Sequence, residues 1–298
     1  MDYYCSMVVE EAYRKAREQL QDIYGTREAA QITDMLIENI CGLTRTQRII
    51  QQKNINLSPV QQQTLLSYLQ ELLAHRPVQY VLHEAWFADK KFYVDENVLI
   101  PRPETEELCE WIISDYNSFK TKSSPVILDV GTGSGCIAIT LKNKIPSAEI
   151  FAADISPGAL QVAEKNASAQ NAHIHFCEMN FLDRNEWSRL PQFDIIVSNP
   201  PYIKKSEAAA MQENVLSYEP HTALFVENDD ACIFYSEIAL FAAEHLYAGG
   251  RLYFEINEAH AGDVRELLQS QSLDNIELRQ DMYGKNRMMR CERKTNSL

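Results

Sequence analysis

The sequence lacks any run of about 20 apolar residues, the length that a helix needs to cross a bilayer. Its first residues, MDYYCSMVVEEAYRKA, carry acidic side chains where a secretory signal peptide needs a basic region, and their apolar run is too short. We therefore expect a cytoplasmic protein that does not associate with membranes.

Cysteine pairs are also lacking. The seven cysteines form no CxxC motif, and their scatter is typical of reduced thiols rather than of a disulfide framework. His173 and His175 would project from one face of a strand, but no third metal ligand stands nearby in the sequence. No metal site is predicted. The cysteines are Cys5, Cys41, Cys109, Cys136, Cys177, Cys232 and Cys291.

Positive charge is in deficit, because 28 Lys and Arg face 42 Asp and Glu, a formal net charge of −14. Residues 1–85 contain 10 acidic and 8 basic side chains, so the rest of the chain carries −12. A protein that binds nucleic acid through a basic surface needs clustered Lys and Arg. The composition therefore disfavours nucleic acid as a partner, although it does not exclude a local basic patch.

The length of 298 residues suggests roughly two globular domains. Residues 1–76 predict a helical domain, since Gly25 and Gly42 end two stretches with apolar spacings of three and four. Ser58-Pro59 predicts the start of a further helix, with Ser as the N-cap and Pro at the first helical position. Its residues alone indicate a packing or docking module, and its position ahead of the second domain favours docking of a substrate.

Pro77 interrupts the helical pattern. Residues 77–101 contain β-branched and aromatic residues on both sides of the polar turn Asp89-Lys90-Lys91, which predicts a β-hairpin that links two domains. Residues 102–298 form the second predicted domain. Pro103 opens a predicted helix there. Acidic residues stand in its first turn, where the positive end of the helix dipole stabilises their negative charge.

The second domain alternates strands and helices, which predicts a doubly wound, mostly parallel sheet with helices on both faces. The predicted strands are 126–130, 150–153, 173–177, 193–197 and 251–256. The predicted helices are 134–142, 157–169, 231–247 and 261–269.

A glycine-rich turn follows the first of these strands. Gly131, Gly133 and Gly135, with Thr132 and Ser134 between them, stand where a strand turns into a helix, the place where open α/β sheets bind ligands. Asp154 ends the second strand, where a carboxylate can accept hydrogen bonds from ribose hydroxyls. Together these residues predict a nucleoside site.

The identity of residue 136 bears on which nucleoside binds. A dinucleotide fingerprint, GxGxxG, needs glycine where Cys136 stands. Asp129, before the turn, suits a ligand with a cationic amine, such as S-adenosylmethionine. Phe181 could pack on the adenine ring, and Asn180 could bond to the base edge; Phe181 could equally be a core residue.

The segment Ser198-Asn199-Pro200-Pro201-Tyr202 follows the fourth strand. Two successive prolines give a stiff backbone whose carbonyls are available as acceptors. The oxygen of the Asn199 side chain and the Pro200 carbonyl could each accept one hydrogen bond from a planar NH₂ group, while Tyr202 lies against its plane. Such a grip would direct a weakly nucleophilic nitrogen and stabilise the positive charge that develops on it.

These motifs resemble the peptide-chain release factor glutamine methyltransferases, the PrmC/HemK family. The resemblance is carried by VLDVGTGSGCIAI, AADIS, VSNPPYI, LIPRPETEEL and SYEPHTAL, and it runs from RPVQYVLHEAWF to GGRLYFEI and GKNRMM. It implies a class I S-adenosylmethionine-dependent methyltransferase with a seven-stranded sheet, preceded by a small helical domain and a β-hairpin.

The resemblance also implies the reaction. S-adenosylmethionine would be the methyl donor and S-adenosylhomocysteine the product, and the acceptor would be the glutamine amide of the GGQ motif in class-I release factors. It implies a cofactor site at Asp129, Gly131 to Gly135, Asp154, Phe181 and Asn199, and a substrate site from Asn199 to Tyr202 in which Asn199, Pro200 and Tyr202 are catalytic. We expect a monomer.

Two positions depart from the family pattern. Asn180 stands where an acidic residue is common, and Val226-Glu227-Asn228 replaces the usual glycines. The first concerns the contact to the adenine edge, and the second concerns a loop.

Two alternatives remain open at this point. An adenine methyltransferase acting on DNA or RNA would use the same Asn-Pro-Pro-Tyr grip on an exocyclic amine, but it would have to capture a base and hold a polyanion. A non-catalytic scaffold could keep a nucleoside site without turnover; the intact Asn199–Tyr202 segment speaks against it.

Overall fold

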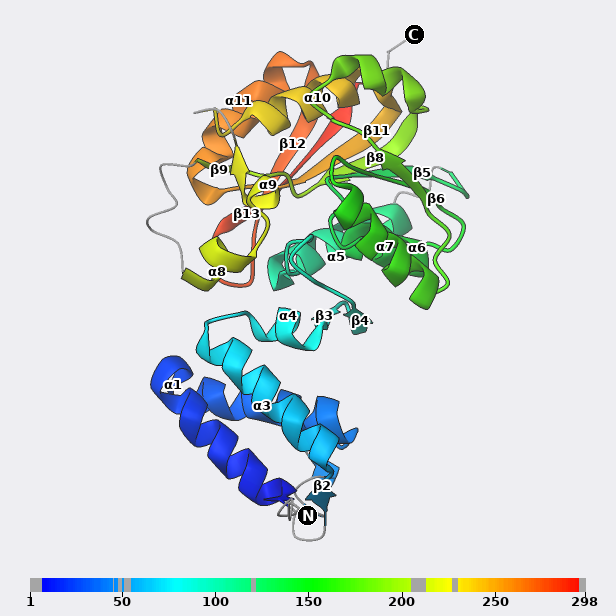
Figure 1. The fold of residues 1–298 in the computed structure, drawn as a ribbon. Helices are drawn as coiled ribbons and strands as arrows, with labels where there is room; N and C mark the ends of the chain where they lie inside the picture. The colour runs from blue at the N-terminus through cyan, green and yellow to red at the C-terminus, as the bar shows by residue number, and fades with distance from the viewer. Residues whose placement is uncertain are drawn as a thin grey trace. The chain divides into compact units, whose positions relative to one another are not determined.

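The computed structural model describes residues 7–44, 46–47, 50, 55–118, 122–204, 213–226 and 230–294. The chain forms two compact units: a helical unit, residues 1–84 with 213–218, and a sheet unit, residues 85–212 with 219–298 (Figure 1). The division falls after Glu84, inside the segment assigned above to the linker. No helix in the described ranges is long and apolar enough to span a bilayer.

The helical unit is built around two long helices, α1 (Val9–Cys41) and α3 (Pro59–Leu73). Gly25 has φ 71° and ψ 168°, so it kinks α1 where the sequence predicts a helix end, and Gly42 caps the helix in the left-handed region. Ser58 is the N-cap of α3, as predicted, and it also forms a capping box with Gln61. The short strands β1 (Met7–Val8) and β2 (Asn56–Leu57) pair antiparallel.

The segment after Pro77 differs from the prediction. Residues 78–82 form a short helix, α4 (Val78–Leu82), and the hairpin is confined to β3 (Ala85–Phe87) and β4 (Lys90–Phe92). Burial explains the helix, because Tyr80, Val81 and Leu82 are all buried and Val81 and Leu82 join the helical core. The turn is at Ala88 and Asp89, which both have positive φ, rather than at residues 89–91.

A later segment of the chain also belongs to the helical unit. Helix α8 (Glu213–Tyr218) groups with residues 1–84, and the Tyr218 hydroxyl donates to the Ala74 carbonyl at 2.7 Å. The helical unit is therefore discontinuous in sequence.

The sheet unit contains a seven-stranded sheet in the order β12-β13-β11-β8-β5-β6-β7 (Figure 1). β13 runs antiparallel to both its neighbours, and the other strands are parallel. The strands are β5 (Val126–Val130), β6 (Glu149–Asp154), β7 (His175–Glu178), β8 (Phe193–Ser198), β11 (Leu246–Glu255), β12 (Leu273–Gln280) and β13 (Asn286–Arg293). This confirms the mostly parallel, seven-stranded sheet.

Helices cover both faces of this sheet, as Figure 1 shows. Along β5, Leu128 and Val130 join one core cluster, while Ile127 joins the other, the alternation expected of a strand with two buried faces. One cluster packs under α10 and α11, and the second under α5 and α6. The helices are α5 (Pro103–Ser118), α6 (Cys136–Lys144), α7 (Pro157–Ala169), α10 (Ile233–His245) and α11 (Ala261–Ser270).

Short elements complete the unit: η1 (Arg184–Arg189), β9 (Ile203–Lys204), α9 (His221–Leu224), β10 (Phe225–Val226) and η3 (Glu258–His260). β9 and β10 pair parallel, beside the segment that follows β8. Val226 ends β10, whereas Glu227 and Asn228 lie outside the described residues.

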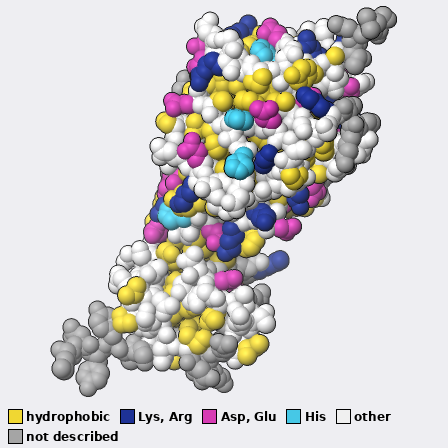
Figure 2. Space-filling model, turned by 90° about the vertical axis from the view of Figure 1, so that its right-hand side faces the viewer, with side chains coloured by type: hydrophobic (Ala, Val, Ile, Leu, Met, Phe, Trp, Pro, Cys, Tyr) yellow, Lys and Arg dark blue, Asp and Glu magenta, His cyan; other side chains and the backbone are white. Residues whose placement is uncertain are grey.

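The surface carries both signs of charge. On the face of the sheet unit drawn in Figure 2, acidic and basic side chains are interspersed, so the described residues form no extended basic patch there. This distribution agrees with the net negative charge of the chain.

Candidate active site

The glycine loop connects β5 to α6 at the point where the strand order reverses between β8 and β6. The backbone N–H groups of Gly131 and Thr132 donate to the Ala153 carbonyl at 2.8 and 3.0 Å, which ties the loop to β6. Gly135 has φ 79°, and a Cβ there would lie 3.0 Å from Ile139 Cδ1. Glycine is therefore required where the loop enters α6.

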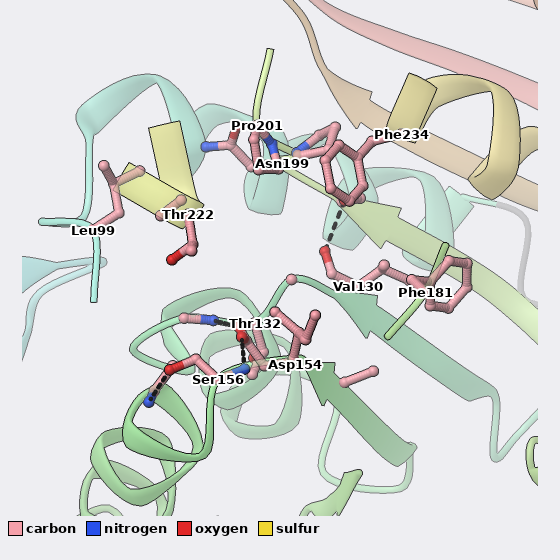
Figure 3. Close-up of a pocket in the computed structure, with 18 of the residues that line it drawn as sticks. Leu99, Val130, Thr132, Asp154, Ser156, Phe181, Asn199, Pro201, Thr222 and Phe234 are labelled. Carbon is pink, nitrogen blue, oxygen red and sulfur yellow. Dashed lines mark hydrogen bonds between the residues drawn. The ribbon is translucent and has the colours of Figure 1, made fainter. Parts of the chain in front are cut away.

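Asp154 lies at the end of β6, facing the loop (Figure 3). Its Oδ2 accepts from Gly133 N at 2.9 Å, and its Oδ1 accepts from Ser156 N at 2.9 Å. Burial raises the pKa of this carboxyl, and hydrogen bonds from the backbone of Ser156, Gly133 and Ile155 oppose the shift. Each oxygen keeps acceptor capacity for a sugar hydroxyl.

Asp129 lies behind the loop and is not among the residues that line the cavity described below. Its Oδ2 accepts from Thr132 Oγ1 at 2.7 Å and from Ala138 N at 3.3 Å. Its Oδ1 is buried with no hydrogen-bond partner in the described part of the chain, and burial raises the pKa of the carboxyl to about 7. Asp129 therefore contacts the glycine loop and does not line the cavity.

The Asn-Pro-Pro segment forms the opposite wall. Asn199 and Pro201 face Thr132 and Asp154 across the cavity in Figure 3, and Pro200 also lines it. Asn199 Nδ2 donates to Thr105 Oγ1 at 3.3 Å. The carboxamide is therefore held by its nitrogen.

Tyr202 is absent from the residues that line this cavity, and its ring packs against the core on the α10 side of the sheet. Burial, with Glu255 nearby, raises the pKa of the hydroxyl to about 12. The side chain is neutral at physiological pH.

Phe181 lies between the cavity and the core. It lines the cavity, and it also belongs to the core, where its ring centroid lies 5.0 Å from that of Phe241. Asn180 lines the cavity too, and its Oδ1 accepts from Leu182 N at 3.1 Å. Its side-chain NH₂ is therefore the group that could reach an adenine edge.

These residues surround one cavity of about 390 Å³, a size typical of small-molecule sites. Of the residues predicted to bind cofactor or substrate, those that line it are Gly131, Thr132, Gly133, Ser134, Asp154, Phe181, Asn199, Pro200 and Pro201, whereas Asp129, Gly135 and Tyr202 do not. Sequence reasoning missed a set of further lining residues, which includes Leu99, Pro101, Arg102, Thr105, Ser156, Thr222 and Phe234. Four of these seven, Leu99, Pro101, Arg102 and Thr105, belong to the LIPRPETEEL motif. From the sequence alone, this motif predicts only a helix start and supports the family resemblance.

The described residues contain one cluster with possible metal ligands, Cys232, His260 and Asp263, whose ligand atoms lie within 4.8 Å of one another. His260 and Asp263 bond to each other at 3.0 Å, and Asp263 is exposed. His175 instead stacks on Phe151 at the sheet edge.

The chemical groups that line the cavity fit S-adenosylmethionine. The carboxylate of Asp154, the ring of Phe181 and the backbone of the glycine loop lie around one space. Asp129 precedes Val130, which lines the cavity, and its Oδ1 is a buried acceptor with no hydrogen-bond partner in the described part of the chain. A cation bound nearby would favour the ionised form of this carboxyl.

The fold recurs in solved structures. The catalytic domain of hMettl16 is 14% identical, with a TM-score of 0.52, and covers 68% of this chain and 74% of that one. The 16S rRNA methyltransferase RsmC of Thermus thermophilus is 17% identical, with a TM-score of 0.51, over 71% of this chain and 50% of that one. These similarities concern the fold alone. The sheet order and the glycine loop define a class I S-adenosylmethionine-dependent methyltransferase.

Sequence comparison identifies the family. Residues 11–82 match the family described as PrmC N-terminal domain, and residues 116–220 match the Methyltransferase small domain. The release factor glutamine methyltransferase of Flavobacterium psychrophilum is 42% identical over 91% of this chain and 94% of its own. That of Bacteroides thetaiotaomicron is 36% identical over 93% of this chain and 97% of its own. The chain belongs to the release factor glutamine methyltransferase family.

Proposed function

We propose that this protein transfers a methyl group from S-adenosylmethionine to the side-chain amide nitrogen of the GGQ glutamine in class-I peptide-chain release factors. The observation that carries this proposal is the position of Asn199 and Pro200, at the wall of a cavity whose other wall is the glycine loop. Membership of the family supports the choice of substrate.

The acceptor grip follows from hydrogen-bond chemistry. An amide nitrogen is a poor nucleophile because its lone pair is delocalised. The Asn199 Oδ1 and the Pro200 carbonyl would each accept one N–H of the glutamine amide, which fixes its direction and stabilises positive charge on nitrogen. The nitrogen then loses a proton to solvent, so no general base is needed.

The donor side is assigned to the loop and its partners. Gly131, Thr132, Gly133 and Ser134 would hold the amino-acid portion, and Asp154 the ribose. Phe181 would contact adenine, while Gly135 and Asp129 would act through the loop. Bound there, S-adenosylmethionine supplies an electrophilic methyl group on sulfur and leaves as S-adenosylhomocysteine.

Tyr202 and Pro201 complete the proposed substrate site. The two prolines stiffen the segment, and the tyrosine ring would lie under the plane of the amide or hold the segment from below. In both arrangements the ring of Tyr202, rather than its hydroxyl, makes the contact that positions the amide.

We also propose that the helical unit docks the release factor and that the protein works in the cytoplasm, where ribosomes and their factors act. The family match over residues 11–82 supports a role for this unit that the methyltransferase sheet alone does not provide.

The direct test is mass spectrometry of a release factor after incubation with this protein and S-adenosylmethionine. We expect one methyl group on the GGQ glutamine, and none on a matched release factor in which that glutamine is alanine. A parallel arm offers DNA and RNA with a labelled donor. Label that enters only nucleic acid would overturn the proposal in favour of an adenine methyltransferase.

A further inference from the structure

Three side chains from separate segments form a hydrogen-bonded chain that ends at Asn199. Asn199 Nδ2 donates to Thr105 Oγ1 at 3.3 Å, and Thr105 Oγ1 donates to Glu255 Oε2 at 2.6 Å. Thr105 stands in the first turn of α5, and Glu255 is the last residue of β11. Both are only 3% exposed, so solvent offers neither of them an alternative partner.

The threonine hydroxyl has a single proton, which decides the direction of the chain. A carboxylate at 2.6 Å is the stronger acceptor, so the proton lies on the Glu255 side. Thr105 Oγ1 can then only accept from the Asn199 side chain, and the group that faces it must be the NH₂. The Asn199 oxygen is therefore turned away from Thr105.

We propose that Thr105 and Glu255 are positioning residues that hold the Asn199 carboxamide with its oxygen toward the acceptor amide, an inference that rests on the proposed function. A carboxamide rotated by half a turn would present its own NH₂ to the NH₂ of the substrate. Two donors would then face each other, and the grip would be lost.

Protonation of Glu255 would reverse the chain. A protonated carboxyl donates to Thr105, whose proton then goes to Asn199, so the carboxamide oxygen must face Thr105. Burial raises the pKa of Glu255 to about 7, although the hydrogen bond from Thr105 favours the carboxylate. The orientation of Asn199 is thus coupled to pH within the physiological range.

Several groups face Glu255 from neighbouring elements. The charges of Arg287 in β13 and Arg102 before α5 favour its ionised form, and Glu104 opposes it. The neutral side chains Tyr202, Tyr235, Cys109 and Cys136 also surround it. With two arginines against one glutamate, the carboxylate form is accessible at neutral pH despite burial.

The test uses single-turnover methylation of a release factor by the full chain at saturating donor. We expect Thr105→Val to lower the rate on the order of 10- to 100-fold, because the carboxamide loses its orientation. Thr105→Ser, which keeps the hydroxyl, should restore most of the rate. Ser114→Ala, an exposed hydroxyl removed from the same helix, is the matched control and should leave the rate unchanged.

The pH profile separates positioning from a merely structural role. In the wild type the rate should rise with pH with an apparent pKa near 7, because only ionised Glu255 orients Asn199. Glu255→Gln should remove this rise, since glutamine does not titrate. At saturating donor the rate does not depend on the affinity for S-adenosylmethionine, so a change in that affinity caused by titration of Asp129 does not affect the profile.

The outcomes are distinct. Donor affinity by calorimetry and thermal unfolding report whether each variant folds; if Thr105→Val does not fold, the Glu255→Gln profile decides alone. A Thr105→Val rate equal to wild type, or a Glu255→Gln profile that keeps the rise, overturns the positioning role and leaves the proposed function intact. A wild type that does not methylate the release factor overturns both.

Discussion

Ser198 and Val130 are joined at the carboxyl ends of two neighbouring strands. The Ser198 hydroxyl donates to the Val130 carbonyl at 2.7 Å, and the two residues are also partners in the β5–β8 ladder. Asn199 follows one of them and Gly131 the other, and the Ser198 side chain is fully buried. The amide grip and the donor loop are therefore fixed to each other by one side chain.

Asn199 carries the first prediction. Asn199→Ala should lower single-turnover methylation about 10²- to 10³-fold, the usual cost of removing one preorganised polar group, while donor affinity stays within about twofold. Asn199→Asp should be no better, because its carboxylate would face Thr105, whose proton is already given to Glu255. Normal methylation by either variant would contradict the role of Asn199.

Tyr202 allows the ring and the hydroxyl to be separated. Burial raises the pKa of the hydroxyl to about 12, so it does not act as a base, and Tyr202→Phe should stay within a few-fold of the wild-type rate. Tyr202→Ala removes the ring and should cost about 100-fold through misplacement of the amide. Equal losses in the two variants would show that the hydroxyl is used.

Asp129 should make stability depend on pH. Its pKa is about 7 in the folded protein against 3.8 for the ordinary group, so the folded state binds more protons between these values. The free energy of unfolding therefore falls as pH rises from about 4 to about 7, by at most roughly 4 kcal/mol. Without donor, Asp129→Asn should unfold at a higher temperature than wild type at pH 8, with a smaller gap at pH 5.

Thermal unfolding at both pH values, with and without S-adenosylhomocysteine, checks this prediction. Asparagine keeps an oxygen to accept from Thr132 and Ala138, which makes it a conservative change. A gap between variant and wild type that stays constant with pH would refute the assignment of the titration to Asp129.

The helical unit offers a surface for the docking prediction. Leu66 and Leu73 are 54% and 41% exposed, and their spacing of seven places them on one face of α3. Leu66→Glu should raise the KM for the release factor severalfold, with kcat and donor affinity unchanged. Ser67→Glu adds the same charge on another face of α3 and should change none of these; equal effects of the two variants would refute docking at Leu66.

Local signals predicted much of the fold. Ser58-Pro59 predicts the start of α3, and the run from Val126 to Val130, apolar except for Asp129, predicts β5 with its observed bounds. The cavity residues that follow the strands were also predicted, because parallel strands bring their carboxyl ends to one edge.

Other features depend on contacts that no local pattern records. α4 forms because its side chains are buried in a core, and the edge strand β12 and its neighbour β13 mix polar and apolar residues without a clear strand pattern. Thr105 and Glu255 are 150 residues apart in the chain. Their pairing follows from the folded sheet, so only the structure brings them to Asn199.

The discontinuity of the helical unit constrains how the protein can be dissected. Between Lys204 at the end of β9 and Glu213 at the start of α8, the chain passes from the unit with the amide grip to the unit with α3. Removal of residues 1–75 would also remove Ala74, whose carbonyl accepts from the Tyr218 hydroxyl, so a truncated protein would report on an altered α8 as well as on lost docking. Single-residue substitutions therefore separate the contribution of each unit to methylation better than a truncation does.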